Sequence, residues 1–186
     1  LLFDEGLSAK GKSIIEQNMN LDLKAAYERS MELAKAHTPI SVGVLKHLAA
    51  LVMRRTGGEV NGFGGSFDSS RGDLRLVNVT AGAGGKTYMN YPKVPQKLED
   101  FCKEINERRK GLLESPDIYE QYKLSFYAHL NLVTIHPWVD GNGRMSRLIM
   151  NHLQYEFGLV PSKVVKDDKA EYIKALEISQ EEESEV

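Results

Sequence analysis

The sequence of 186 residues is poor in cysteine and in long apolar runs. Its single cysteine, Cys102, excludes an intramolecular disulfide, so a hydrophobic core must hold the fold. No run approaches the roughly 18 consecutive apolar residues of a transmembrane helix. The first residues lack the basic and apolar regions of a signal peptide. We therefore expect a cytoplasmic protein that does not associate with membranes.

An excess of charge of one sign is also missing. The 24 lysine and arginine residues nearly balance the 26 aspartate and glutamate residues, which gives a formal net charge of -2. This balance argues against a protein built to bind nucleic acid, and we expect no nucleic-acid partner. Hydrophobic residues make up 41% of the chain, enough for a core, and the length fits one domain.

The spacing of apolar residues predicts a mainly α-helical fold. Nine of the 16 glycines fall between Gly57 and Gly85, and this density excludes a helix there. Within that region, the β-branched segment 74–79 is predicted to pair with 86–91 as a small β-hairpin. Helices are predicted over 8–17, 21–36, 41–55, from Pro95 onward, and over 115–135, 144–157 and 168–179.

The stretch from His136 to Arg147, between two predicted helices, concentrates residues that bind anions. The run 141–143, Gly-Asn-Gly, lets successive backbone N–H groups converge at the start of the following helix. Such a helix start binds phosphate. Arg144 and Arg147 add two cations where the helix dipole disfavours them, so a purely structural role fits poorly. Together these features predict a polyphosphate site.

Two further residues of this stretch suggest metal binding and proton transfer. Asp140 is a lone carboxylate beside the predicted phosphate site, which is how Mg²⁺ is often held. His136, four residues earlier, is suited to act as a general base near neutral pH. Taken singly, each has a simpler interpretation as a turn residue or a structural histidine. Their density favours catalysis, whereas Trp138 has no chemical role and is predicted to anchor the loop in the core.

The run from His136 to Arg147 resembles the signature of the Fic domain, His-Pro-Phe-x-Asp/Glu-Gly-Asn-Gly-Arg/Lys-x-x-Arg. It departs from that signature only at Trp138, where phenylalanine is usual. The segments around 65–67 and 74–91 resemble the β-hairpin that the family uses as a flap over its active site.

The resemblance implies a fold and a division of the chain. The expected fold is a Fic-type helical bundle with a small β-hairpin flap, over residues 41–179. A helical segment over 1–40 would precede this core, and an acidic tail over 180–186 would follow it.

The resemblance also implies an activity, the transfer of AMP from ATP to a Ser, Thr or Tyr hydroxyl of a target protein or of the chain itself. His136 would deprotonate the hydroxyl, and Asp140 would hold Mg²⁺ between the phosphates. Tyr172 would border the adenine. The target would dock along the flap, at about 74–91. Phosphate binding would fall to the rest of the signature: Gly141, Asn142, Gly143, Arg144 and, for the γ-phosphate, Arg147.

Residues 12–18 resemble the inhibitory helix of many Fic proteins, with the pattern Ser/Thr-x-x-x-Glu-Gly/Asn. Glu16 takes the place of the inhibitory glutamate, which would pair with Arg147 and block the γ-phosphate pocket. Lys12 and Gln17 depart from the pattern. The simpler interpretation is an ordinary amphipathic helix with Glu16 in water.

Other functions remain open at this point. The same fold could remove AMP from a modified protein, or transfer another nucleotide or phosphate-containing group. A nucleotide-binding module without turnover is a third possibility. His136 disfavours the last, because a module that only binds has no need of a base beside the phosphates. A homodimer is plausible.

Overall fold

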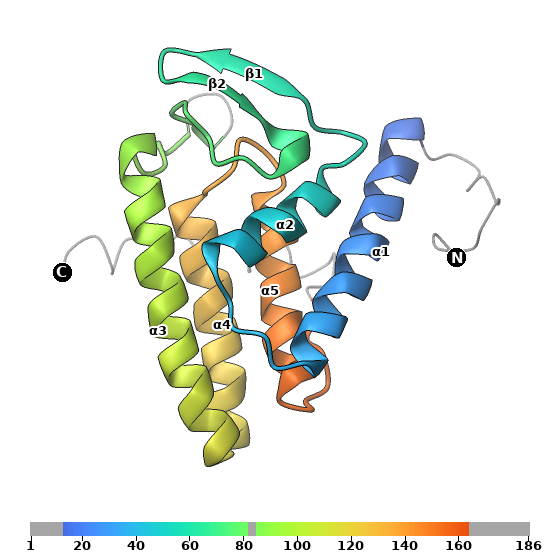
Figure 1. Ribbon diagram of the computed structural model, residues 1–186, viewed down its shortest axis with the longest axis vertical. Coiled ribbons are helices and arrows are strands. Elements are labelled where there is room, and N and C mark those ends of the chain that lie inside the picture. Colours follow the sequence, from blue (N-terminus) through green and yellow to red (C-terminus); the bar gives the residue numbers. More distant parts are fainter. Residues whose placement is uncertain (1–12, 82–84, 164–186) are drawn as a thin grey trace.

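The computed structural model describes residues 13–81 and 85–163. In this part of the chain, long helices form a bundle and a small antiparallel sheet lies at one end of it (Figure 1). The helices are α1 (Ile14–Lys35), α2 (Val42–Val52), α3 (Val94–Glu114), α4 (Ile118–Ile135) and α5 (Asn142–Glu156). The strands are β1 (Glu59–Gly62) and β2 (Gly65–Asp68), and the short 3-10 helices are η1 (Ser69–Arg71) and η2 (Tyr91–Lys93). The mainly α-helical fold is confirmed.

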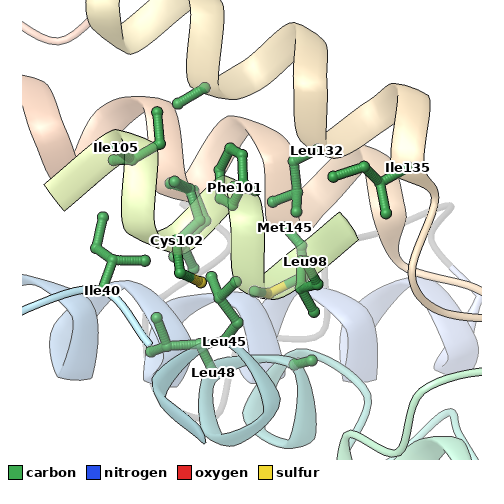
Figure 2. Close-up of a cluster of buried hydrophobic side chains, with 14 of the residues drawn as sticks. Ile40, Leu45, Leu48, Leu98, Phe101, Cys102, Ile105, Leu132, Ile135 and Met145 are labelled. Atoms are coloured by element: carbon green, nitrogen blue, oxygen red, sulfur yellow. The ribbon is translucent and has the colours of Figure 1, made fainter. Parts of the chain in front are cut away.

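The core lies where α2, α3, α4 and α5 meet. α4 runs along α5, with α3 on the far side of α4 and α1 against α5 (Figure 1). Figure 2 shows aliphatic and aromatic side chains of these helices interleaved around Cys102, which is buried on α3. Fully buried members include Leu45, Leu48, Leu98, Ile105, Leu132 and Met145. This packing places the loop between α4 and α5 at the same end of the bundle as the sheet (Figure 1).

Helix α1 corrects the prediction of two separate helices over 8–17 and 21–36. It runs without a break from Ile14 to Lys35 and begins with a capping box between Ser13 and Glu16. Asn20, which lies between the two predicted helices, donates from Nδ2 to the backbone oxygen of Glu16 at 2.8 Å, so its amide is satisfied on the helix. Packing of α1 against α5 overrides the weak helix propensity of the asparagines.

The predicted strand over 74–79 does not form, which is a second correction. Among the described residues, pairing across this region consists of a bridge between Thr80 and Thr87 and of backbone bonds from Ala81 N to Lys86 O and from Tyr88 N to Val79 O. Arg75 points inward, is 1% exposed and binds backbone carbonyls, so its segment is fixed to the end of α4 instead of pairing along its length. We call residues 74–91 the flap.

The regular hairpin, β1–β2, comes earlier than predicted. Glu59 faces Asp68 and Gly62 faces Gly65, so Phe63 and Gly64 form a two-residue turn. Gly65 has φ of 113°, a conformation that other residues rarely adopt. These strands are polar and rich in glycine, so they lack the alternating apolar residues by which a strand is predicted.

Other boundaries bear on the later argument. α5 begins at Asn142, two residues before the predicted start at Arg144. The N-cap of α4 is Asp117, whose side chain accepts from Glu120 N, so the helix starts after the predicted Ser115. The predicted helix 168–179 and the acidic tail lie outside the described residues. None of the helices in 13–81 and 85–163 is both long and apolar enough to span a bilayer.

Candidate active site

His136 ends α4 and has a fixed side-chain orientation. Its φ of 51° and ψ of 61° lie in the left-handed region, uncommon for a residue other than glycine. The Nδ1 atom is 3.2 Å from the backbone oxygen of Val133. Since a carbonyl can only accept, Nδ1 carries the proton of the neutral ring and Nε2 keeps its lone pair. The imidazole is therefore arranged to accept a proton at Nε2.

The surroundings of His136 favour its neutral form. Burial is the largest influence and lowers the pKa of the imidazole below its usual 6.5. The positive charge of Arg75 lowers this pKa further, while the Val133 carbonyl and the Asp140 carboxylate raise it in part. Because the net shift of the pKa is downward, the ring is uncharged at neutral pH, as a general base must be.

The loop after His136 is held by a side-chain clamp. Asn142 Oδ1 accepts from the backbone N–H of Trp138 at 3.0 Å, and Asn142 Nδ2 donates to the backbone oxygen of Trp138 at 2.8 Å. Trp138 is 1% exposed, and its Nε1 donates to the backbone oxygen of Gly72 at 3.2 Å. The expected anchoring role of Trp138 agrees with this burial. The clamp fixes the backbone between the base and the helix start.

Removing the Asn142 clamp should destabilise the protein. Asn142→Ala would leave a buried N–H and a buried carbonyl of Trp138 without partners, at a cost of about 2 kcal/mol in the free energy of unfolding. Urea unfolding followed by circular dichroism measures this. Asn142→Asp, which keeps the acceptor and loses the donor, should fall between wild type and Asn142→Ala. An Asn142→Ala variant as stable as wild type would contradict the clamp.

The start of α5 forms the anion-binding part of the site. Gly141 precedes the helix with φ of 82°, and a Cβ there would lie 3.0 Å from Met53 Sδ. The first N–H groups of α5 have no carbonyl to bond within the helix, and they sit at the positive end of its dipole. A cavity of about 350 Å³ opens over them. Its lining comprises Met19, His136, Val139, Asp140, Gly141, Asn142, Gly143, Arg144 and Arg147.

Both arginines lie beside this cavity. Arg144 Nη1 is buried and makes no hydrogen bond within residues 13–81 and 85–163, and its Nη2 lies 3.6 Å from Asp140 Oδ2. Arg147 lies over Gly143, where a Cβ would be 3.4 Å from Arg147 Nη1. Two guanidinium groups at the positive end of a helix repel the dipole and each other unless an anion joins them. The arrangement suits a polyphosphate.

Asp140 is placed to hold a cation over bound phosphates. Its Oδ1 accepts from the backbone N–H of Gly141 at 2.7 Å, and its side chain is 69% exposed in the cavity. The described residues contain no cluster of three or more His, Cys, Asp or Glu able to enclose a metal. Mg²⁺ does not need such a cage, because it takes one or two carboxylates together with substrate phosphates. Asp140 fits that mode of binding.

Two predicted residues are not in the lining of this cavity as the structure describes it. Glu16 closes the capping box of α1, where its Oε2 accepts from Ser13 N at 3.1 Å. The residue of α1 that lines the cavity is Met19, three positions further along. Tyr172 lies outside the described residues.

The motif did not point to two other neighbours of His136. The ring of Tyr88, from the flap, stacks on the imidazole with ring centroids 3.7 Å apart and planes inclined by 11°. Arg75 Nε donates to the backbone oxygen of His136 at 2.6 Å. An arginine between two leucines in an apolar segment is a detectable signal, whereas nothing in the sequence marks Tyr88.

Comparison with known proteins gives consistent matches. A family model described as "Fic/DOC family" matches residues 39–154. Protein adenylyltransferase Fic of Nematostella vectensis is 36% identical over 173 residues, covering 91% of this chain and 36% of that protein. Protein adenylyltransferase fic-1 of Caenorhabditis elegans is 26% identical over 180 residues, covering 96% of this chain and 32% of that protein. The chain thus spans about a third of the length of these relatives.

Solved structures share the fold. A Fic-1 fragment from Caenorhabditis elegans superposes with a TM-score of 0.73 at 24% identity, covering 96% of this chain and 48% of that one. A Fic domain containing signaling protein from Bacteroides thetaiotaomicron gives a TM-score of 0.75 at 16% identity, covering 93% of this chain and 61% of that one.

Proposed function

Because the chain belongs to the Fic/DOC family, we propose that it is a protein adenylyltransferase, which transfers AMP from ATP to a hydroxyl side chain of a protein. One observation carries the proposal. The cavity at the junction of α4 and α5 unites an oriented, neutral imidazole with a helix start and two guanidinium groups. A base next to a polyphosphate site suits the activation of a hydroxyl that attacks phosphorus.

The proposed reaction assigns one step to each part of the cavity. Nε2 of His136 removes the proton from a Ser, Thr or Tyr hydroxyl while that oxygen bonds to the α-phosphorus of ATP. The bond from the α-phosphorus to the oxygen bridging to the β-phosphate breaks, and pyrophosphate leaves. The first N–H groups of α5 and Arg144 stabilise the developing charge, and Arg147 holds the γ-phosphate. Asp140 would hold Mg²⁺, which neutralises phosphate charge when bound.

The target protein is proposed to dock on the flap. The short ladder there includes Ala81 N to Lys86 O at 3.0 Å and Tyr88 N to Val79 O at 3.1 Å. An extended target segment would add to this edge through main-chain hydrogen bonds. Such docking depends little on target side chains and would bring a hydroxyl near His136, because Tyr88 of the flap touches its ring.

The position of the label in ATP tests the proposal. Wild type and Glu16→Gly are incubated with Mg²⁺ and ATP carrying radioactive phosphorus at either the α- or the γ-phosphate. Transfer of AMP predicts labelled protein from α-labelled ATP only. Label from the γ-position would indicate phosphate transfer instead. ATP binding without label from either position would indicate a nucleotide-binding module.

We further propose that Glu16 restrains this activity by pairing with Arg147. Support comes from α1, which reaches the cavity through Met19, and from Arg147, which lies over Gly143 and lines the same cavity. The restraint requires the carboxylate of Glu16, whereas its present bond to Ser13 N requires only an oxygen acceptor. Substitutions can therefore separate the two roles.

Glu16→Gly should raise the rate of AMP transfer, because Arg147 then becomes available to the γ-phosphate. Glu16→Gln should raise it as well, since glutamine keeps the capping box but loses the charge. Ser13→Ala removes the other half of the box and keeps the carboxylate, so its rate should stay at the wild-type level. An unchanged rate in Glu16→Gly, or an equal rise in Ser13→Ala, would contradict the restraint.

A further inference from the structure

Arg75 is a buried cation that binds the main chain at several points. It is 1% exposed, and burial lowers the pKa of its guanidinium. Nε donates to the backbone oxygen of His136 at 2.6 Å, and Nη2 lies 3.4 Å from that of Ile135. Nη1 donates to Val77 O at 2.9 Å, and Nη2 also donates to Met89 O. One side chain thus satisfies carbonyls from three separate segments.

These carbonyls belong to two parts of the site, the end of α4 that carries His136 and the flap. Ile135 and His136 form the end of α4 that carries the base. Val77 and Met89 belong to the two sides of the flap, and the backbone N–H of Arg75 adds a bond to Pro137 O at 3.0 Å. A left-handed residue such as His136 persists only where its surroundings hold it. Arg75 stabilises this conformation of His136 from the flap, through its bonds to His136 O and Pro137 O.

The bond from Arg75 to the flap lies next to Tyr88, which contacts the base. It precedes Met89, whose carbonyl Arg75 binds, and its ring lies flat on the imidazole at 3.7 Å. Stacking covers one face of the imidazole and leaves the ring edge as the approach to Nε2. The charge of Arg75, from the flap, lowers the pKa of the imidazole, and that of Asp140, from the loop before α5, raises it; Arg144 and Arg147 line the same cavity.

We propose that Arg75 is a positioning residue that fixes the flap to the base, so that Tyr88 stacks on His136 and a hydroxyl reaches Nε2 only along the ring edge. The inference rests on the proposed function in one respect, the role of His136 as base. A target that moves the flap therefore also moves the imidazole. Lysine cannot replace Arg75, because one ammonium group lacks the planar fork that serves four carbonyls at once.

The ring current of Tyr88 gives a test that does not depend on activity. A stacked aromatic ring shifts the imidazole C–H signals of His136 upfield in a proton–carbon NMR spectrum of histidine-labelled protein. Tyr88→Phe should keep this shift, and Tyr88→Ala should lose it. Arg75→Lys should lose most of it, while Arg71→Lys, an exposed arginine four residues earlier, should not change it. The signals of the buried His129 and His152 report on the rest of the fold.

Kinetics give the second readout. If the wild type transfers AMP, Tyr88→Ala and Arg75→Lys should lower kcat severalfold and leave KM for ATP unchanged, because the phosphate-binding residues stay in place. An Arg75→Lys spectrum with the wild-type His136 shift would overturn the proposal. So would displacement of the His129 and His152 signals, because Arg75 would then support the whole fold. If the protein shows the predicted NMR shifts of His136 but transfers no AMP, the proposed adenylyltransferase function is refuted. The positioning of His136 and Tyr88 by Arg75 then still stands.

Discussion

Replacing His136 by alanine should lower the rate of AMP transfer by about 100- to 10,000-fold, the usual contribution of a general base. The hydroxyl of the target then loses the acceptor that Nε2 provides, since Nδ1 already donates to Val133 O. Initial rates with α-labelled ATP, in the background of Glu16→Gly, measure the loss. Binding of ATP should persist, because the helix start and both arginines remain.

A matched variant guards against a change of fold. Asparagine adopts the left-handed conformation of His136 more easily than most residues, so His136→Asn should keep the backbone and still lose the base. His136→Asn should unfold near the wild-type temperature. A rate in His136→Asn close to that of wild type would show that the imidazole is not the base.

The pH dependence follows from the same residue. Only the neutral imidazole accepts a proton, so the rate should fall as the pH drops through the pKa of His136. Burial and the charge of Arg75 lower this pKa below 6.5, so the midpoint of the fall in rate should lie below pH 6.5. A midpoint at or above pH 6.5 would contradict the neutral, buried imidazole.

The second large effect concerns stability. Trp138→Ala should lower the free energy of unfolding by about 3–5 kcal/mol, because it removes a fully buried indole and leaves a cavity beneath the loop. It also removes the bond from Nε1 to Gly72 O. Urea unfolding followed by far-ultraviolet circular dichroism measures the loss, since the only tryptophan of the chain is the one replaced.

Trp138→Phe separates packing from hydrogen bonding. Phenylalanine is the usual residue of the signature and keeps an aromatic ring, so only the Nε1 bond and some contact area are lost. We expect a cost of about 1 kcal/mol. A Trp138→Ala variant within that margin of wild type would show that the indole does not anchor the loop.

Spacing along the chain predicts which residues of the signature share a cavity better than it predicts the structure of the flap, for a physical reason. His136, the residues 139–144 and Arg147 are neighbours along the chain, so a helix end and a helix start bring them to one cavity. The flap depends on Arg75, whose partners at Ile135 and Met89 lie far from it in sequence. No local pattern predicts that an arginine turns inward and prevents strand pairing.

Asn142 and Tyr88 show the same limit on a smaller scale. The prediction for Asn142 used its backbone, at the start of a helix, whereas its side chain clamps Trp138. The stacking of Tyr88 on His136 joins residues 48 positions apart, and only the folded chain reveals it. Helix α1 is continuous across 18–20 because its packing against α5 outweighs the weak helix propensity of its asparagines.

Mass spectrometry of the intact protein shows whether His136 transfers AMP. Glu16→Gly and the double variant Glu16→Gly with His136→Ala are incubated with ATP and Mg²⁺, each with and without a target protein. If His136 is the base of AMP transfer, Glu16→Gly should gain the mass of one adenylyl group, on the chain or on the target. The double variant should gain none. An equal increase in both would show that His136 does not carry the reaction, and an increase by one phosphate would replace AMP transfer with a different chemistry.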